Sequence, residues 1–461
     1  MKKDFHIIIF LLLTFGFSSC KKEFLEKKPI STKVIPSTLQ DFQQLLDQTF
    51  IFNECPALGE ISTDDYQINE VSYLSSPTNV YERNAYVWAK DIFPGVESVP
   101  DWNFPYQQVF YANVALEGVN KIGITNANQG QWNTIKGSAL FLRAFAFFNL
   151  AQVFSPAYGG DADINPYGIP LRLTSGIDDA TTRSTVKQTY DQIIMDLKQA
   201  INLLPEVFQL TNRNRPSKSA AEALLARVYL SMRDYQNAGL YANSSLAFYN
   251  KLIDYNSLSI TASFPFDILN QEVLYQSNLL TTNQILTNIR INSGYKVEPS
   301  ILQMYHGNDL RKLLFFSDVG RVKGSYASRT RFSGLATDEL YLIRAECNAR
   351  ASKTTEAMKD LNDLLRTRWK KNPDGSTSYI DQTANNSQEA LSKILLERRK
   401  ELIFRGLRWI DLRRLNLEGQ NITLSRAVNG VMYSLAPNDP RYVLPIPNDV
   451  INLTGIAQNP R

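Results

Sequence analysis

Apolar residues recur at intervals of three and four along most of this chain, and this period predicts a mainly α-helical protein. Thr38 has the character of a helix N-cap, because Leu39 and Phe42 follow it on one helical side. Longer periodic stretches lie within residues 102–114, 132–153 and 186–204. Pro156 and Pro205 come soon after the last two stretches and prevent either helix from continuing.

The same spacing of twelve residues between alanines occurs twice, from Ala226 to Ala238 and from Ala345 to Ala357. Small side chains at such positions let two antiparallel helices approach closely, as they do in a tetratricopeptide unit. The stretches 219–248 and 337–366 are therefore expected to form tetratricopeptide-like hairpins. Two ordinary helical hairpins are the alternative, since alanine is common in any helix.

Other parts of the chain lack a helical period. Residues 51–101, 155–183 and 255–335 are rich in turn-forming and polar residues, which predicts long loops with short elements. A last helix is expected from about Ser387 to Phe404, and Gly406 ends it. The tail from Tyr442 to Pro447 contains two prolines and is expected to be extended.

The N-terminus has the pattern of an export signal. A basic start precedes an apolar run over residues 7–17, which is too short for a membrane span of ~20 residues. Small residues then lead directly to Cys20, as in a bacterial lipoprotein, where acyl chains such as palmitate on the cysteine anchor the mature chain. We expect residues 1–19 to be a signal peptide and residues 20–36 a lipidated tether. An ordinary signal peptide with an incidental Cys20 is the alternative.

Composition excludes several classes of function. The 461 residues carry a net charge of +4 without a long block of one sign, which argues against a nucleic-acid partner. His306 is the single histidine after the expected signal, which removes most routes to a histidine-ligated zinc site or a histidine-activated nucleophile. Cys55 and Cys347 do not make a disulfide framework, and two unpaired thiols are favoured over a bond between them.

Aromatic residues and carboxylates are densest before the first long helix. Sugars present C–H faces that stack on aromatic rings and hydroxyl groups that bond to carboxylates, so this region is the candidate ligand site. Its candidate contacts are Asp64, Asp65, Tyr66, Tyr81 and Trp88. The alternative is that these residues fill small satellite cores. Trp102 has helical spacing and is assigned to the core.

Two charged motifs admit a functional and a structural interpretation. One is a cluster around the last expected helix, formed by Glu397, Arg398, Arg399, Glu401, Arg408, Asp411, Arg413 and Arg414. It could clamp a phosphate or a carboxylate, but its acids and bases nearly balance, which favours an internal salt-bridge network. The other motif, Asp161 to Asn165, alternates like a calcium loop. Pro166 and Arg172 occupy positions where such a loop needs glycine and glutamate, so no metal site is expected.

Several motifs, in this order along nearly the whole chain, together resemble the SusD/RagB family. They are the lipobox ending at Cys20, the segments 142–150, 168–171 and 218–229, the sequence ERRKEL at 397–402, GLRWIDLRR at 406–414, LPIP at 444–447 and QNP at 458–460. Arg405 departs from the pattern, since many members carry an acidic residue there.

The resemblance implies a mainly α fold of four tetratricopeptide-like hairpins, with long loops and a few short strands. The domain would cover residues 37–461, in an N-terminal part, 37–330, and a C-terminal part, 331–461. The resemblance also implies an outer-membrane lipoprotein facing the cell exterior, as a lid on a SusC-like TonB-dependent transporter. Such proteins bind an oligosaccharide, or in RagB-type members a peptide, without catalysis and without a cofactor.

Two other classes of function stay open at this point. A lipid-anchored scaffold could hold a protein partner in a tetratricopeptide groove. A glycoside hydrolase is the third possibility, but neighbouring carboxylates such as Asp64 and Asp65 do not by themselves place two acids across a glycosidic bond.

Overall fold

The computed structural model describes residues 36–461 apart from residues 76–77, 325 and 327–329, and residues 38–461 form one compact unit. Cys20, the signal segment and most of the expected tether lie outside the described residues. The helices of the first half are α3 (Leu39–Leu46), α4 (Thr49–Phe52), α5 (Leu58–Ile61), α6 (Glu70–Ser75), α7 (Val80–Tyr86), α8 (Pro100–Asn120), α9 (Gln129–Phe154), α10 (Val186–Leu203), α11 (Lys218–Met232) and α12 (Tyr235–Phe248). Those of the second half are α13 (Gln284–Ile291), α14 (Pro299–Gln303), α15 (Arg311–Phe315), α16 (Thr337–Arg350), α17 (Thr354–Arg366), α18 (Ser387–Glu401), α19 (Arg408–Asn416) and α20 (Asn448–Thr454).

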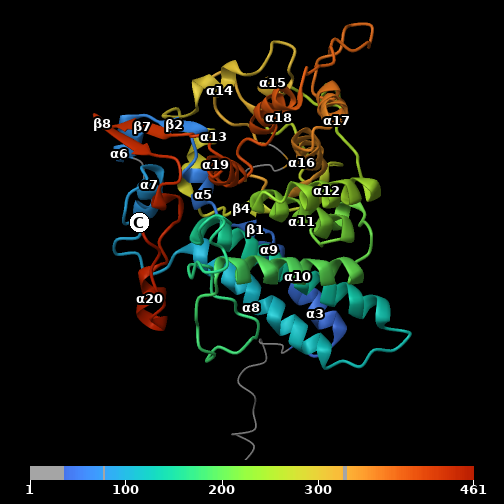
Figure 1. Ribbon diagram of the computed structural model, residues 1–461, viewed down its shortest axis with the longest axis vertical. Helices are drawn as coiled ribbons and strands as arrows, with labels where there is room; N and C mark the ends of the chain where they lie inside the picture. The colour runs from blue at the N-terminus through green and yellow to red at the C-terminus, as the bar shows by residue number, and fades with distance from the viewer. Residues whose placement is uncertain (1–35, 76–77, 325, 327–329) are drawn as a thin grey trace, which may run out of the picture. The chain divides into compact units, whose positions relative to one another are not determined.

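The long helices pack side by side in chain order, from α8 through α12 and on to α16, α17 and α18 (Figure 1). The pairs α11/α12 and α16/α17 form the two hairpins that the alanine spacing predicted. Ala226, Ala238, Ala345 and Ala357 are all fully buried, as close helix packing requires. The mainly α, tetratricopeptide-like fold is therefore confirmed.

Local signals set the helix starts. Thr38 and Thr185 each form a capping box, in which the side chain accepts a hydrogen bond from the third residue of α3 or α10. Helix α9 ends at Ser155 because Pro156 follows. In the described part of the chain α9 alone is long and apolar enough to cross a membrane, but its most apolar stretch is 94% buried inside the fold. It is the central core helix.

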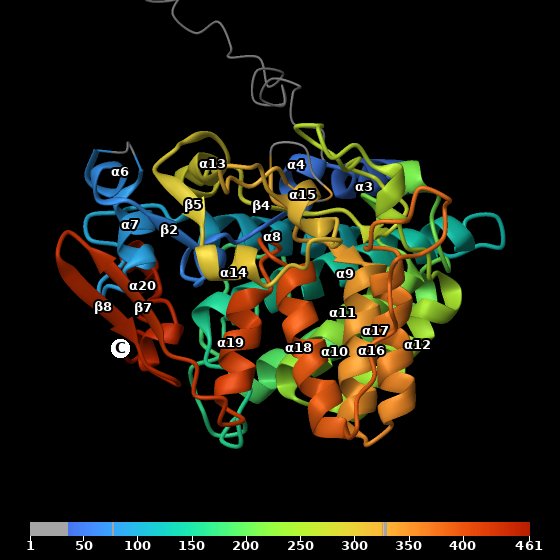
Figure 2. The same ribbon diagram turned by 90° about the horizontal axis from the view of Figure 1, so that it is seen from above.

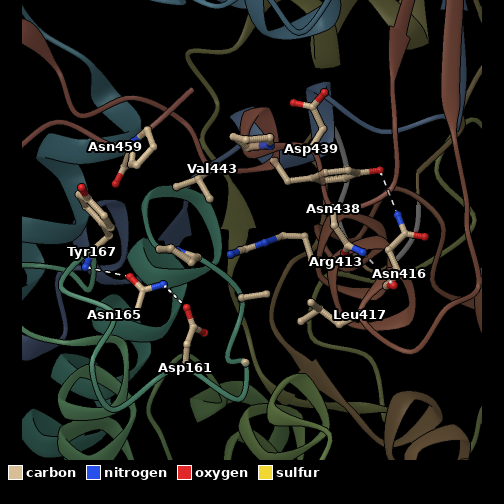
Figure 3. A pocket seen from close by; sticks show the side chains of 16 residues that line it. Asp161, Asn165, Tyr167, Arg413, Asn416, Leu417, Asn438, Asp439, Val443 and Asn459 are labelled. Carbon is tan, nitrogen blue, oxygen red and sulfur yellow. Dashed lines mark hydrogen bonds between the residues drawn. The ribbon is translucent and has the colours of Figure 1, made fainter.

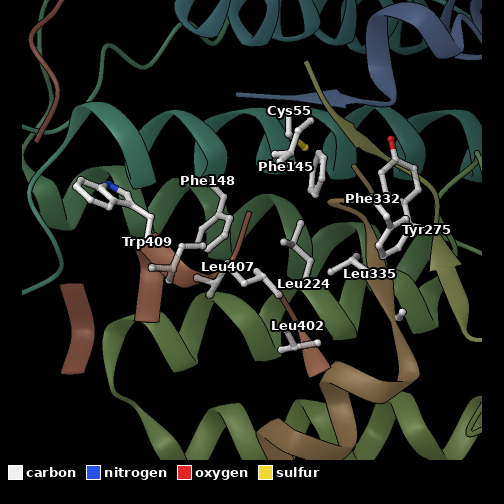
Figure 4. Packing of buried hydrophobic residues seen from close by; sticks show 14 of the residues in the cluster. Cys55, Phe145, Phe148, Leu224, Tyr275, Phe332, Leu335, Leu402, Leu407 and Trp409 are labelled. Atoms are coloured by element: carbon white, nitrogen blue, oxygen red, sulfur yellow. The ribbon is translucent and has the colours of Figure 1, made fainter. Parts of the chain in front are cut away.

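The hydrophobic core surrounds α9. Phe141 and Phe145 meet the ring of Tyr275 edge-on, with centroid distances of 4.9 and 5.3 Å. Figure 4 shows Phe145 and Phe148 of α9 in the same cluster as Leu224, Leu402 and Trp409, which come from distant parts of the chain. The C-terminal helices thus close the same core that the N-terminal helices begin.

Short strands pair outside the helical array, and two of the pairs join the N-terminal loops to the segment inserted between the two hairpins. They are β1 (Glu54–Cys55), β2 (Tyr66–Ile68), β3 (Val273–Tyr275), β4 (Asn278–Leu279), β5 (Tyr295–Val297), β6 (Leu335–Ala336), β7 (Leu424–Val428) and β8 (Val431–Leu435). β1 pairs in parallel with β4, and antiparallel pairs join β2 to β5, β3 to β6 and β7 to β8. Figure 2 shows β2, β5, β7 and β8 together at one side of the helical array.

One expectation about these segments needs correction. The helix beginning at Ser387 is not the last, because α19 and α20 follow it. The hairpin β7–β8 and the short helices α13 to α15 carry too few periodic residues to stand out in the sequence. The expected hairpin segments are otherwise placed correctly, and Cys55 and Cys347 are buried, unpaired thiols.

The charged cluster around α18 is a buried salt-bridge network, as its balanced charges predicted. Arg398 of α18 pairs with Asp411 of α19 at 2.8 Å, and Arg414 of α19 pairs with Glu346 of α16 at 2.6 Å. The exceptional Arg405 is buried and pairs with Asp338. Because the arginines of this cluster are taken up by carboxylates or, for Arg413, by backbone carbonyls, the network fixes the C-terminal helices rather than binding an anion.

Candidate ligand-binding site

The five predicted ligand contacts have internal partners in the structure. Asp64 accepts hydrogen bonds from Arg408 Nε at 2.9 Å and from Arg399 Nη2 at 2.8 Å. Burial alone would raise the pKa of Asp64, but the two guanidinium groups lower it to about 2. This carboxylate therefore ties a loop near the N-terminus to the last long helices.

Tyr66 and Trp88 enclose the side chain of Arg426 from β7. The guanidinium carbon lies 5.4 Å from the centroid of the Tyr66 ring and 4.7 Å from that of the Trp88 ring. The guanidinium N–H groups donate to the carbonyls of Thr63 and Tyr86. Tyr66 donates its hydroxyl proton to a backbone carbonyl at 2.7 Å, and the Trp88 indole does so at 2.9 Å. Both rings are 2% exposed, so they hold the β7–β8 hairpin.

Asp65 and Tyr81 are also buried. Tyr81 packs on Phe93, and its hydroxyl oxygen accepts a hydrogen bond from Asn79. Asp65 has its nearest cation, Arg399, at 3.5 Å, and neither carboxylate oxygen accepts a hydrogen bond. Ligand contact by the five residues stays a prediction, and their burial favours the structural alternative. An open site has to be found elsewhere in the described residues.

A cavity of about 350 Å³ opens between the loop that follows α9 and the C-terminal tail. We call it the loop–tail cavity. Its lining residues are Pro156, Ala157, Gly159, Asp161, Asn165, Tyr167, Arg413, Asn416, Leu417, Asn438, Asp439, Pro440, Tyr442, Val443, Asn459 and Pro460. Figure 3 shows Asn459 beside Tyr167 at one end of the cavity, and Asn416 and Leu417 at the other.

Hydrogen bonds to the end of α9 hold the two walls together. Leu444 donates its backbone N–H to the Val153 carbonyl at 2.9 Å, and Asn459 Nδ2 donates to the Phe154 carbonyl at 3.0 Å. Arg413 donates to the carbonyls of Gln152 and Ser155. Burial lowers the pKa of Arg413 to about 10, because no carboxylate accepts from it. These contacts use carbonyls that the last turn of a helix leaves without partners.

One polar atom of this wall lacks a partner. Asn459 is 4% exposed, and its Oδ1 accepts no hydrogen bond although its amide nitrogen makes two. An unsatisfied buried acceptor costs free energy, about 1–3 kcal/mol. Asn438, which comes from the same tail but lies across the cavity from Asn459 (Figure 3), is exposed, and its Nδ2 donates to the Asn416 carbonyl at 3.2 Å.

The remaining polar groups of the cavity are carboxylates and amides held in fixed positions. Asn165 donates to Asp161 at 2.9 Å and accepts from the Tyr167 backbone N–H. A hydrogen bond from Arg441 lowers the pKa of Asp439, so this carboxylate is ionised. Proline and tyrosine rings form the apolar surfaces between these groups. The arrangement can bind a small neutral ligand that has many hydroxyl groups, and its size is at the lower end for ligand cavities.

Sequence motifs include residues from both walls of the loop–tail cavity, but nothing in the sequence indicates that the two walls meet. Asp161 and Asn165 stood out as a weak calcium pattern, and Asn459 stood out only as part of the tail motif. Asn459 and the Phe154 carbonyl that it contacts are 305 positions apart. Hydrophobic periodicity indicates only contacts between residues that are close in sequence, so it does not predict this cavity.

The hairpin array and its looped cavity define a helical-repeat ligand-binding protein. Residues 23–230 match a family model described as starch-binding associating with outer membrane, and residues 319–461 match a model described as the SusD family. The chain belongs to the SusD/RagB family, as its motifs predicted. Membership indicates a nutrient-binding role and an outer-membrane location, in a family of binding proteins rather than enzymes.

Individual relatives are distant but cover most of the chain. A SusD-like protein, P2, from Formosa agariphila is 26% identical over an aligned length of 377 residues, and the match covers 68% of this chain and 71% of the relative. A SusD superfamily protein from Bacteroides thetaiotaomicron superposes with a TM-score of 0.71 at 21% identity, covering 92% of this chain and 100% of that one. A laminarin-binding SusD-like protein superposes with a TM-score of 0.60 at 18% identity, covering 92% and 98%.

Proposed function

We propose that this chain is a surface lipoprotein that binds an oligosaccharide in the loop–tail cavity and hands it to a SusC-like TonB-dependent transporter. The observation that supports this ligand class is the cavity itself, whose lining combines amides, carboxylates and ring faces. Sugar hydroxyls both donate and accept, so they suit such a mixed lining. A starch-binding family description and a laminarin-binding relative support glucans as the first probes.

Binding can be tested with Asn438, which is exposed and has a left-handed backbone, φ 59°. Asn438→Gly removes the amide without straining that backbone. Asn429→Gly is the matched control, because Asn429 also has a left-handed backbone, φ 51°, and lies in the exposed β7–β8 turn outside the cavity. Calorimetric titration of the full chain in detergent would use maltose-type and laminarin-type oligosaccharides and mixed peptides.

The native chain and Asn429→Gly should bind one glycan series equally well, and Asn438→Gly should bind it about ten-fold more weakly, as expected for one lost hydrogen bond. Binding of peptides but not of glycans would show that the ligand is a peptide, as in RagB-type members of the family. Release of shortened sugars would instead indicate a hydrolase.

The proposed lipid anchor is based on the lipobox, and the proposed transporter partner is based on the family. Cells fed labelled palmitate should label the native chain but not Cys20→Ser. The native chain should also co-purify with a large β-barrel from the outer membrane. Absence of label would refute the anchor, and capture of a soluble protein in place of a barrel would favour the scaffold alternative.

A further inference from the structure

A second cavity, of about 280 Å³, lies on α8 beside the same loop and the same tail. We call it the aromatic cleft. Trp102, Tyr106 and Phe110 provide its floor, and because they are spaced by four they lie along one side of the helix. Loop residues 170–181 and two residues of α20 form its other walls.

The rings of the cleft range from buried to exposed. Trp102 is 5% exposed and packs on Phe154 at 5.1 Å and on Tyr106 at 4.9 Å, which confirms its core assignment. Phe110 is 38% exposed, and Ile177 on the facing loop is 81% exposed. The cleft therefore presents an apolar surface on a base that packing holds rigid.

The facing loop is held in place by hydrogen bonds. Tyr106 donates its hydroxyl proton to the Pro170 carbonyl at 2.9 Å. Arg172 donates to the Asp179 carbonyl at 2.7 Å and to the Thr181 hydroxyl at 2.8 Å. The exposed apolar residues thus lie on a fixed wall of the cleft.

The two cavities are lined by different residues of the same loop and the same tail. Tyr167 lines the loop–tail cavity and Pro170 lines the aromatic cleft. Three residues of chain span at most ~11 Å, so the two cavities are separated by no more than a short segment at this point. Arg183 fixes that segment to the tail, because it donates to the Gly168 carbonyl at 2.8 Å and to the Ala457 carbonyl at 2.9 Å. Figure 1 shows this loop below α9, with α20 on its other side.

We propose that the loop–tail cavity and the aromatic cleft are two subsites of one elongated site for a glycan chain. The cleft stacks one sugar ring on Phe110 and the neighbouring rings, while the polar cavity bonds to the hydroxyl groups of another sugar. This inference rests on the proposed function. It adds that the protein recognises the length of the glycan. A short sugar fills one subsite, and a longer chain fills both.

An extended peptide suits this face less well. Peptides that bind lengthwise commonly add a strand to an exposed sheet edge. In the described residues the named strands lie outside segments 155–183 and 438–460, so neither cavity is bordered by such an edge. A chain of sugars requires only ring faces and hydroxyl partners.

The test compares Phe110→Ala with Asn438→Gly on sugars of two lengths. Phe50→Ala is the matched control for the first variant, since Phe50 is 69% exposed on α4, outside both cavities. Titrations of the full chain would use the trisaccharide and the heptasaccharide of the maltose and laminarin series. Far-UV circular dichroism would confirm that each variant is folded.

For the heptasaccharide, Phe110→Ala and Asn438→Gly should each weaken binding about ten-fold, and Phe50→Ala should leave it unchanged. For the trisaccharide, only one of the two cavity variants should weaken binding. A heptasaccharide that responds to one variant alone, or binds no tighter than the trisaccharide, overturns the two-subsite proposal and leaves glycan binding standing. If the native chain binds neither series, the glycan function fails, and the two-subsite proposal fails with it.

Discussion

Asp65 is a buried carboxylate that should destabilise the fold at neutral pH. It is 1% exposed, and neither oxygen accepts a hydrogen bond. Burial first, and the neighbouring charge of Asp64 second, raise the pKa of Asp65 from 3.8 to about 6, against the opposing effect of Arg399. A group whose pKa rises on folding contributes stability below its unfolded pKa, and this contribution is lost as pH rises through its folded value.

The expected effect of Asp65→Asn follows from this shift. About two pKa units correspond to ~3 kcal/mol, so the variant should exceed the native chain in free energy of unfolding by up to ~3 kcal/mol above pH 6. The difference should vanish near pH 4, where the native carboxyl group is protonated. Urea titrations at several pH values between 4 and 8 would measure it, with the native chain and the variant compared at each pH.

The neighbouring residue provides a control of opposite sign. The pKa of Asp64 is lowered to about 2 by Arg408 and Arg399, which overcome the effect of burial. Asp64→Asn should therefore destabilise the protein at pH 7.5 and lose this effect as pH falls toward 2. If Asp65→Asn also lowers the stability at pH 7.5, or if its effect does not change with pH, the explanation from burial is wrong.

Two further substitutions test the packing. Arg426→Ala should lower the free energy of unfolding by at least ~3 kcal/mol in urea titrations, because it removes donors to two buried carbonyls and a cation from among three aromatic rings; an effect below ~1 kcal/mol would refute this role. Gly118→Ala should lower the melting temperature, since a Cβ there would overlap the Phe42 ring between α8 and α3, at a cost of ~1–3 kcal/mol. Gly130→Ala, also helical but with open space around it, should leave the melting temperature unchanged or raise it.

The sequence predicted those parts of the fold that depend on neighbouring residues. Thr38 and Thr185 cap their helices through residues three positions ahead, and the alanine spacing reports a packing between consecutive helices. The candidate site depends on distant contacts. Aromatic rings such as those of Tyr66 and Trp88 are typical of a sugar-binding surface. In the structure both rings instead enclose the side chain of Arg426, which lies more than 330 positions away in the sequence. Composition alone does not distinguish a ring that stacks on a ligand from one that stacks on a guanidinium group.

The role of the tail at the end of α9 has a consequence for biosynthesis. One wall of the loop–tail cavity, including Asn459, comes from residues 438–460. These residues follow the long helices α8 to α18 in the chain, so they leave the ribosome after those helices have been synthesised. A product that terminates before residue 438 would retain the helical hairpins and lack this wall. Translation through residue 460 is therefore a condition for a complete binding cavity.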